Sequence, residues 1–244
     1  GATIQTDQFK FGGSSYYGDC VDDSLQVSNS VATFGSDDFT IESWIYLETG
    51  LTQDHYILAN WTSTNDSNNT VYFLLHNSGG LRFISKVGGS IVVNAEQNAT
   101  TGWSTGQWYH VAATRSGNTF RVFRDGTLLG SDTYSGSIIS GTQNTYIGNH
   151  NFTTSGYVDG YLDEVRITKG VARYTSNFTP QSREFYPATG VGDITSNSID
   201  SVLEGDVELN QTSPKSYNWP NNVRGTDYID AVSNLSTLPT LNDD

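Results

Sequence analysis

The sequence contains one cysteine and no long apolar run. Cys20 is the only thiol among 244 residues, so no disulfide can form within the chain, and its stability must come from buried surface. No apolar stretch approaches the roughly 18 residues that a membrane-spanning helix needs. We therefore expect no insertion of these residues into a membrane.

Basic residues are also scarce. The chain has 12 Lys and Arg against 26 Asp and Glu, which gives a formal net charge of -14 and a pI near 4.4. Nucleic acids and anionic membrane surfaces both bind proteins through cations that neutralise phosphate charge. The charge balance therefore argues against either kind of partner.

Signs of nucleophilic catalysis and of a coiled coil are absent from the sequence. The four histidines have no cysteine or serine partner in a nucleophile motif such as Gly-x-Ser-x-Gly; they are His55, His76, His110 and His150. No heptad run predicts a coiled-coil oligomer. We expect no enzyme of this kind, and the sequence leaves open whether the protein is a monomer or a homo-oligomer.

The residues that are present are typical of an all-β protein with long polar loops. Hydrophobic residues make up 35% of the chain and charged residues only 16%, with 25 glycines. From about residue 8 to 168, short β-rich runs alternate with turn residues, which predicts a two-sheet antiparallel sandwich. In "FTIESWIYLE" the aliphatic residues have one parity while Trp44 and Tyr46 have the other, so this strand should be covered on both faces. Asp125-Gly126 predicts a tight hairpin.

The stretch "YLDEVRI" poses a question about register. Val165 and Ile167 alternate with polar residues as in a half-buried strand, but Leu162 breaks that alternation. Two explanations are open. Either a β-bulge lies near Asp163, or the carboxylate of Asp163 points inward and must be hydrogen-bonded there.

The pattern changes near residue 187, which divides the chain into a domain over residues 1–186 and an arm over residues 187–244. The arm holds nine acidic residues against Lys215 and Arg224. We expect an extended acidic arm or a small appendage that becomes ordered against a partner. Its aromatic residues could also fold back on the first domain.

Four segments, "DDFTIESWIYL", "GQWYHVAATRSGNTFRVFRDGTLL", "TYIGNH" and "GYLDEVRITKGVARYTSNFTP", together resemble the laminin G-like branch of the concanavalin A-like lectin/glucanase superfamily. The resemblance covers about residues 8–185. It implies a jelly-roll sandwich with rim loops that relatives use for calcium and glycans, and it implies that the "LDEVRI" strand closes the domain beside the amino-terminal strand. The ending "ITKGVARYTSNFTP" resembles the version of this module found in bacteriophage structural and tail-fibre proteins.

The resemblance carries neither the catalytic nor the full calcium motif of relatives. Superfamily members that hydrolyse β-glucans use a Glu-x-Asp-x-x-Glu run, and no such run occurs here. In pentraxin relatives two calcium ions are held by carboxylates and amides, whereas the matching positions here hold only amides or non-acidic residues: Asn68, Asn69, His150, Asn151 and Phe152. Asp66 and Asp159 could still support one weak calcium site, against the alternative of solvated loop acids.

Two polar loops offer groups for binding a glycan, which needs an aromatic surface and nearby amides. We expect the loops to face each other at one rim. The alternative is that Trp61 and Phe152 close the end of the sandwich and that the asparagines favour turns. The candidate ligand-binding residues are Trp61, Asn65, Asn68, Asn69, His150, Asn151, Phe152 and Tyr157.

The sequence therefore predicts a non-enzymatic module on the surface of a virion that attaches to host glycans. A first alternative is a structural decoration or adaptor protein that docks into other virion subunits through residues 187–244. A second alternative is a secreted adhesion domain of a cell.

Overall fold

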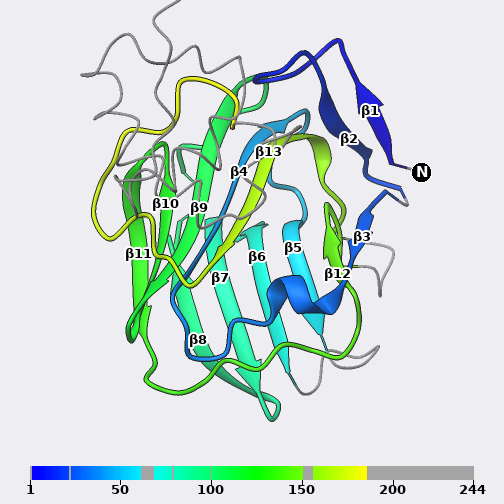
Figure 1. The fold of residues 1–244 in the computed structure, drawn as a ribbon. Helices are drawn as coiled ribbons and strands as arrows, with labels where there is room; N and C mark the ends of the chain where they lie inside the picture. The colour runs from blue at the N-terminus through cyan, green and yellow to red at the C-terminus, as the bar shows by residue number, and fades with distance from the viewer. Residues whose placement is uncertain are drawn as a thin grey trace, which may run out of the picture. The chain divides into compact units, whose positions relative to one another are not determined.

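The computed structural model describes residues 2–21, 23–61, 69–78, 80–99, 101–150 and 156–185. They form two antiparallel sheets packed face to face (Figure 1), which confirms the predicted all-β sandwich. The chain divides into two units, Gly1–Glu184 and Phe185–Asp244. The predicted arm, residues 187–244, lies outside the described residues.

Seven strands form one sheet and six form the other, with one short 3₁₀-helix, η1 (Asn29–Ala32). The seven-stranded sheet has the order β1 (Thr3–Gln5), β2 (Ser15–Asp19), β13 (Asp159–Lys169), β4 (Phe39–Leu47), β9 (Trp108–Ser116), β10 (Thr119–Arg124) and β11 (Thr127–Thr133). The six-stranded sheet has the order β3 (Leu25–Val27), β12 (Thr145–Ile147), β5 (His55–Trp61), β6 (Thr70–His76), β7 (Gly80–Val87) and β8 (Ser90–Glu96).

The interior between the sheets is built from alternate residues of the strands. Phe39, Ile41 and Ile45 of β4 point inward and meet Phe73 and Phe83 of the other sheet. Burying each such side chain contributes about 1.5–3 kcal/mol. Trp44 on the opposite parity is also buried, so β4 is covered on both faces as predicted.

A tight turn at Asp125 and Gly126 connects two strands of the antiparallel meander of β9, β10 and β11. Asp125 and Gly126 have φ of 49° and 76°, the left-handed values that a tight two-residue hairpin requires. The hairpin predicted at Asp125-Gly126 is therefore confirmed, and it joins β10 to β11.

Strand β13 closes the seven-stranded sheet between β2 and β4, as the resemblance implied. Of the two explanations of its register, the bulge is confirmed, whereas the inward carboxylate is wrong, because Asp163 lies opposite Trp44 and points to the outer face of the sheet. A bulge shifts the register between Asp163 and Arg166, with Glu164 at φ 53°. The Asp163 carboxylate accepts hydrogen bonds from the backbone N–H groups of Lys10 (2.8 Å), Phe11 (3.0 Å) and Glu164 (2.8 Å).

After β13 the chain runs back over the outer face of the seven-stranded sheet, where Figure 1 shows it in yellow. The Tyr174 and Phe178 rings stack with centroids 3.5 Å apart, and they pack against Phe123 and His110 of that face. The Thr114 hydroxyl donates to the Tyr174 carbonyl oxygen (2.9 Å). This outer layer explains why the face beneath it is buried. None of the described helices is long and apolar enough to cross a membrane.

Candidate functional site

A second apolar cluster lies outside the interior of the sandwich, on the outer face of the six-stranded sheet. Alternation along β5, β6, β7 and β12 brings its members to one face, because side chains two residues apart point the same way. A bulge between Tyr56 and Leu58 shifts the register of β5 so that both Tyr56 and Ala59 reach this face. The cluster, here called the outer aromatic face, consists of Tyr56, Ala59, Trp61, Tyr72, Leu74, Ile84 and Tyr146.

The aromatic rings of this face contact one another in an ordered series. Trp61 and Tyr146 stack with centroids 5.0 Å apart and an interplanar angle of 22°. Tyr56 meets Tyr72 edge-on at 5.1 Å and His150 edge-on at 4.5 Å. Offset-stacked and edge-to-face pairs are the favourable arrangements for aromatic rings. The rings therefore hold each other in fixed positions before any ligand arrives.

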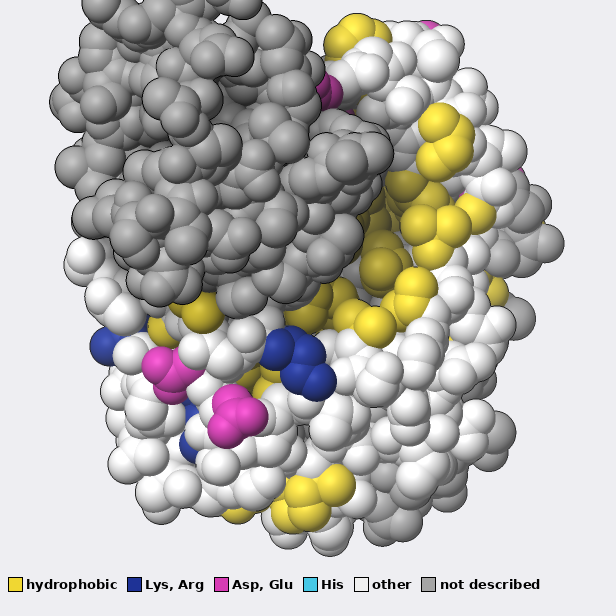
Figure 2. Space-filling model, viewed as in Figure 1, with side chains coloured by type: hydrophobic (Ala, Val, Ile, Leu, Met, Phe, Trp, Pro, Cys, Tyr) yellow, Lys and Arg dark blue, Asp and Glu magenta, His cyan; other side chains and the backbone are white. Residues whose placement is uncertain are grey.

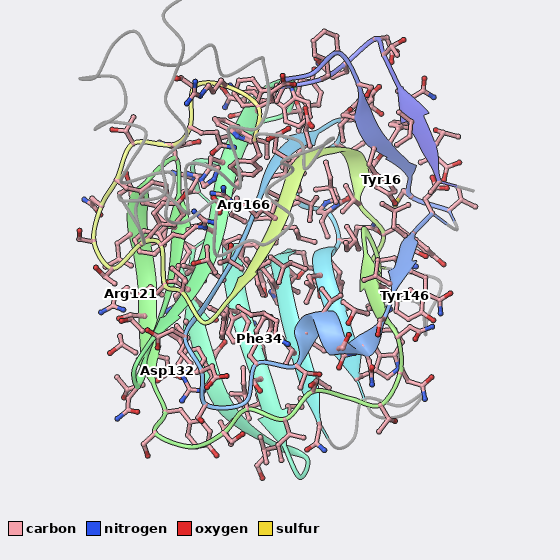
Figure 3. The ribbon with its side chains drawn as sticks, in the orientation of Figure 1. Tyr16, Phe34, Arg121, Asp132, Tyr146 and Arg166 are labelled. Carbon is pink, nitrogen blue, oxygen red and sulfur yellow. The ribbon has the colours of Figure 1, made fainter. Side chains whose placement is uncertain are left out.

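Tyr146 is the accessible member of the stacked pair. Trp61 is only 3% exposed, whereas Tyr146 is half-buried and lies at the edge of the molecule in Figure 3. The exposed Gln26 side chain donates from Nε2 to the Tyr146 hydroxyl (3.2 Å). The buried Trp61 ring stacks on Tyr146 from the neighbouring strand, and Tyr146 offers a ring and a polar group to solvent.

Charged residues also reach this face. Arg82 of β7 and Glu96 of β8 lie directly opposite each other and form an ion pair with Nε and Oε2 2.6 Å apart. Because opposite-charge cross-strand pairs are favourable, this pair fixes both side chains beside Ile84. It supplies a donor group and an acceptor group next to the aromatic rings.

The two loops that should face each other are anchored at opposite ends of β5, so that expectation is wrong for their described residues. Trp61 lies at the end where β5 pairs with Thr70 of β6, while His150 packs on Tyr56 near the start of β5. Seven residues of strand separate the ends by about 20 Å. Antiparallel pairing of β12 with β5 causes this, because the chain leaves β12 towards the start of β5.

The predicted ligand-binding residues that the structure describes lie at the two ends of the six-stranded sheet and are not gathered at one rim. Asn69 lies at the Trp61 end, where its Oδ1 accepts a hydrogen bond from the Gly88 N–H (3.0 Å). Tyr157, 8% exposed, lies at the other end, where its carbonyl oxygen accepts from Gln53 Nε2 (3.1 Å). The remaining candidates, Asn65, Asp66, Asn68, Asn151 and Phe152, lie outside the described residues.

A glycine sets the geometry at the His150 end. Gly156 has φ of +90°, and its N-terminal neighbours are not described. A Cβ at this position would lie 2.7 Å from His150 Nε2 and 3.0 Å from Tyr56 Cδ2. The Gly156 carbonyl oxygen also accepts from the Tyr56 N–H (3.2 Å). Only glycine allows the backbone to pass this close to the His150 and Tyr56 rings.

Asp159 is held within the protein framework at the start of β13. Its Oδ2 accepts from the Thr49 hydroxyl (2.5 Å), and its backbone N–H donates to His55 Nδ1 (3.3 Å). Burial lowers the pKa of His55, although Asp159 and Asp54 act in the opposite direction. Across the described ranges, no three His, Cys, Asp or Glu side chains gather closely enough to hold a metal ion. The partner predicted for Asp159, Asp66, lies outside those ranges.

Sequence reasoning missed Tyr56, Tyr72 and Tyr146. All three lie within segments that the sequence identified as strands or as family motifs. The available signal was parity: Tyr72 and Leu74 share one parity in "TVYFLLH", opposite to Val71, Phe73 and Leu75. Aromatic residues on the outer parity of a strand are candidates for a binding surface as well as for packing.

Three described carboxylates are buried, as catalytic acids often are: Asp23, Glu42 and Asp163. Asp23 Oδ2 accepts from the Asp19 N–H (2.7 Å). Glu42 is fully buried: Oε1 accepts from Arg166 Nε (2.9 Å) and pairs with its Nη2 (2.8 Å), while Oε2 contacts His110 Nε2 (3.1 Å) and accepts from the Tyr174 hydroxyl (2.8 Å). Asp163 accepts hydrogen bonds on both oxygens, from Lys10 and Phe11 on Oδ2 and from Glu164 on Oδ1. Burial raises the pKa of Glu42, but His110, Arg166 and Tyr174 outweigh burial and hold it below its ordinary value.

The model of a family described as the concanavalin A-like lectin/glucanases superfamily matches residues 19–173. No curated protein matches the sequence.

Two solved structures show the same fold. Domain 4 of AbnA, a GH43 extracellular arabinanase from Geobacillus stearothermophilus in complex with arabinotriose, is 17% identical with a TM-score of 0.54, over 70% of this chain and 76% of that chain. The enzymatically active domain of tailspike protein 2 from bacteriophage CBA120 is 13% identical with a TM-score of 0.53, over 68% of this chain but only 27% of that chain.

Proposed function

The chain belongs to the concanavalin A-like lectin/glucanase superfamily, and from that premise we propose that it is a non-enzymatic, lectin-like module that binds a glycan on the outer aromatic face. The observation that carries the proposal is the pair of stacked rings, the buried Trp61 and the half-buried Tyr146, outside the interior core. An aromatic ring covers the apolar face of a sugar, and fixed polar groups nearby recognise its hydroxyls.

The neighbouring polar groups suit this role. Gln26 already directs its amide to the Tyr146 hydroxyl, and the Arg82–Glu96 pair presents a donor and an acceptor. An arabinanase domain of the same fold has been solved in complex with arabinotriose, which supports the proposal that this fold binds a sugar here. His150 and Tyr157 border the same sheet at its far end, so a longer glycan would extend towards them.

We propose a non-enzymatic role because Glu42 and Asp163, two buried carboxylates of the seven-stranded sheet, are occupied by hydrogen bonds to the protein. A glycosidase needs two carboxyl groups placed on either side of the bond to be cleaved. Glu42 and Asp163 each use both oxygens for hydrogen bonds to the protein, and the two lie in the seven-stranded sheet under other residues. Neither is therefore suited to act as an acid, base or nucleophile.

Binding to host surface polysaccharides tests the proposal. We expect the wild-type chain to bind at least one of a panel of bacterial and animal glycans, and Tyr146→Ala to bind it about tenfold more weakly, the equivalent of about 1.4 kcal/mol. Tyr146→Phe should retain most of the affinity if stacking dominates. Phe9→Ala, which removes an exposed ring elsewhere, is the matched control. Equal binding by Tyr146→Ala and wild type would contradict the proposed site.

We place the module on the surface of a virion. The ending "ITKGVARYTSNFTP", with its likeness to phage structural proteins, motivates this location, and the fold shared with a bacteriophage tailspike is compatible with it. Residues 187–244 would then contact other virion subunits. Deleting residues 187–244 should abolish incorporation into particles while leaving glycan binding intact. Loss of incorporation in a chain that binds no glycan would favour the structural decoration role instead.

The single weak calcium site at Asp66 and Asp159 stays a prediction. Glycan binding measured with calcium and with a chelator tests it, since a required calcium would make binding depend on the ion. Unchanged affinity in chelator would remove calcium from the proposal.

A further inference from the structure

Four aromatic residues form a row across the opposite sheet, on the outer face of its seven strands. Tyr17 of β2 lies directly opposite Tyr161 of β13, Tyr161 lies opposite Tyr46 of β4, and Tyr46 lies opposite Trp108 of β9. The four residues therefore occupy one level of four neighbouring strands. They come from positions in the sequence that share no local pattern, and none of them belongs to the outer aromatic face described above.

The row is not part of the hydrophobic interior. Its neighbours in sequence, Tyr16, Ile45, Tyr109 and Leu162, are members of the interior cluster, and strand alternation directs the row to the other side of the sheet. Tyr17, Tyr46 and Trp108 are half-buried, and Tyr161, between two of them, is 6% exposed. On the face drawn in Figure 2, hydrophobic side chains gather on the side of β2 and β13. Packing of the interior does not require three large, half-exposed rings in a row on the outer face, so their placement favours a role in binding.

The rings are in contact but are not coplanar. Their centroids are 4.8, 5.7 and 5.5 Å apart along the row, and successive planes meet at 42°, 81° and 57°. Three strand spacings give the row a length of about 14 Å. Coplanar rings would suit the flat surface of a crystalline polymer, whereas this tilted row suits one extended chain that twists.

Polar groups at the row can recognise sugar hydroxyls. The Tyr17 hydroxyl donates to Glu48 Oε2 (3.3 Å), and Tyr161 also hydrogen-bonds this exposed carboxylate, whose remaining lone pairs can accept from a ligand hydroxyl. The Trp108 indole N–H is buried, so Trp108 offers a ligand its half-buried ring and not this donor. Burial and the charge of Glu48 raise the pKa of Tyr161 to about 12, so its phenol keeps its proton at neutral pH.

The charges around the row select the ligand class. Asp7, Glu48, Asp159 and Asp19 all act on the tyrosines of the row, and each adds negative potential. Like charges oppose an anionic partner. We propose that Tyr17, Tyr161, Tyr46 and Trp108 form a second carbohydrate-binding surface, which holds a single chain of a neutral polysaccharide across the seven-stranded sheet.

This surface lies on the sheet opposite the outer aromatic face, so the two can be separated by mutation. Titration of soluble neutral polysaccharides (linear arabinan, xylan and a mixed-linkage β-glucan), with polygalacturonate as the acidic counterpart, provides the measurement. We expect at least one neutral polymer to bind, with about tenfold weaker affinity for Trp108→Ala and for Tyr46→Ala. Trp108→Phe should bind nearly as well as wild type, because it keeps a ring. Polygalacturonate should bind no more tightly than the neutral polymers.

The variant Tyr146→Ala distinguishes the two surfaces. If the row binds, Tyr146→Ala retains affinity for the neutral polymer and the double variant Tyr146→Ala/Trp108→Ala loses it. Thermal unfolding of each variant must match wild type within a few degrees, and Tyr46→Leu, which also removes the ring, serves where Tyr46→Ala fails to fold. Unchanged affinity in folded Trp108→Ala, preference for polygalacturonate, or no binding to any neutral polymer would overturn the inference. The first of these outcomes would leave the proposed function on the outer aromatic face intact.

Discussion

Glu42 and Tyr174, 132 residues apart in the chain, are joined by a hydrogen bond in which the Tyr174 hydroxyl donates to Glu42 Oε2 over 2.8 Å. Glu42 is fully buried in the centre of the seven-stranded sheet, and Tyr174 lies on the segment that covers this sheet. Arg166 and His110 fill the remaining positions around the carboxylate. One acid therefore fixes the covering segment to β4, β9 and β13 together (Figure 3 labels Arg166).

We predict that Glu42→Gln destabilises the protein by about 3–5 kcal/mol, because it removes the negative charge that Glu42 places against the largely buried Arg166 guanidinium. Urea unfolding followed by tryptophan fluorescence measures this change. Asp7→Asn, which removes an exposed carboxylate, should shift the free energy of unfolding by less than about 0.5 kcal/mol. A Glu42→Gln variant as stable as Asp7→Asn would show that the cluster does not hold the covering segment.

Asp163 should matter for a different reason, since its carboxylate satisfies three backbone N–H groups. Asp163→Asn replaces one acceptor oxygen by a donor and weakens hydrogen bonds to charge, each contributing about 1.5–3 kcal/mol. We expect a loss of about 2 kcal/mol in the free energy of unfolding. The matched control is Asp19→Asn, where the exposed carboxylate accepts from the Val21 N–H on Oδ1. Hydrogen exchange at Lys10 and Phe11 should rise in Asp163→Asn alone.

The lowered pKa of His55 predicts how the stability of the protein depends on pH. Burial holds its pKa below the ordinary value of 6.5, so the folded state keeps the neutral ring. A depressed pKa contributes stability above the unfolded value, and this contribution is lost as the pH falls below about 6.5 towards the folded value. The loss has a slope of at most about 1.4 kcal/mol per pH unit for one proton.

Unfolding of wild type and His55→Asn at pH 7.5 and 5.5 tests this prediction. The wild type should lose more stability than His55→Asn between these pH values. His76→Asn, which changes a more exposed histidine, should behave like wild type. Identical pH dependence in wild type and His55→Asn would mean that His55 has the same pKa in the folded and the unfolded protein, and it would contradict the prediction.

Gly156→Ala should disturb the His150 end of the outer aromatic face. A Cβ would meet His150 Nε2 at 2.7 Å, and the residue would also be held at φ +90°. Each strained backbone position costs on the order of 1–3 kcal/mol, and the close contact adds to that cost. Gly13→Ala is matched in φ, at +87°, but would meet nothing within 4 Å. We expect Gly156→Ala to be clearly less stable than Gly13→Ala, as measured by thermal unfolding.

The sequence predicted those features that depend on neighbouring residues. Alternation along β4 and the Asp125-Gly126 turn are local, and both are confirmed. Leu162 signalled an irregularity in β13, and of the two causes that were open the bulge occurs, while the Asp163 carboxylate points outward and not inward. A local pattern is sufficient here because strand parity and turn conformation are set within a few residues.

The features that the sequence did not reveal depend on which strands become neighbours. The position of β12 beside β5 puts Trp61 and His150 at opposite ends of one face, and nothing near either residue shows this. The row of Tyr17, Tyr161 and Tyr46 likewise requires β2, β13 and β4 to be adjacent and in register. Such pairings join distant parts of the chain, so the candidate site was predicted in its residue types but not in its arrangement.

The adjacency of β2 and β13 also has a mechanical consequence. Both ends of the described chain, β1 with β2 and the segment after β13, attach to the seven-stranded sheet. A pulling force applied between these ends would shear the pairing of β2 with β13 and of β13 with β4 before it reached β5 or β6. Tension on the molecule would thus bypass the six-stranded sheet, and Tyr146 and Trp61 would keep their stacking under load.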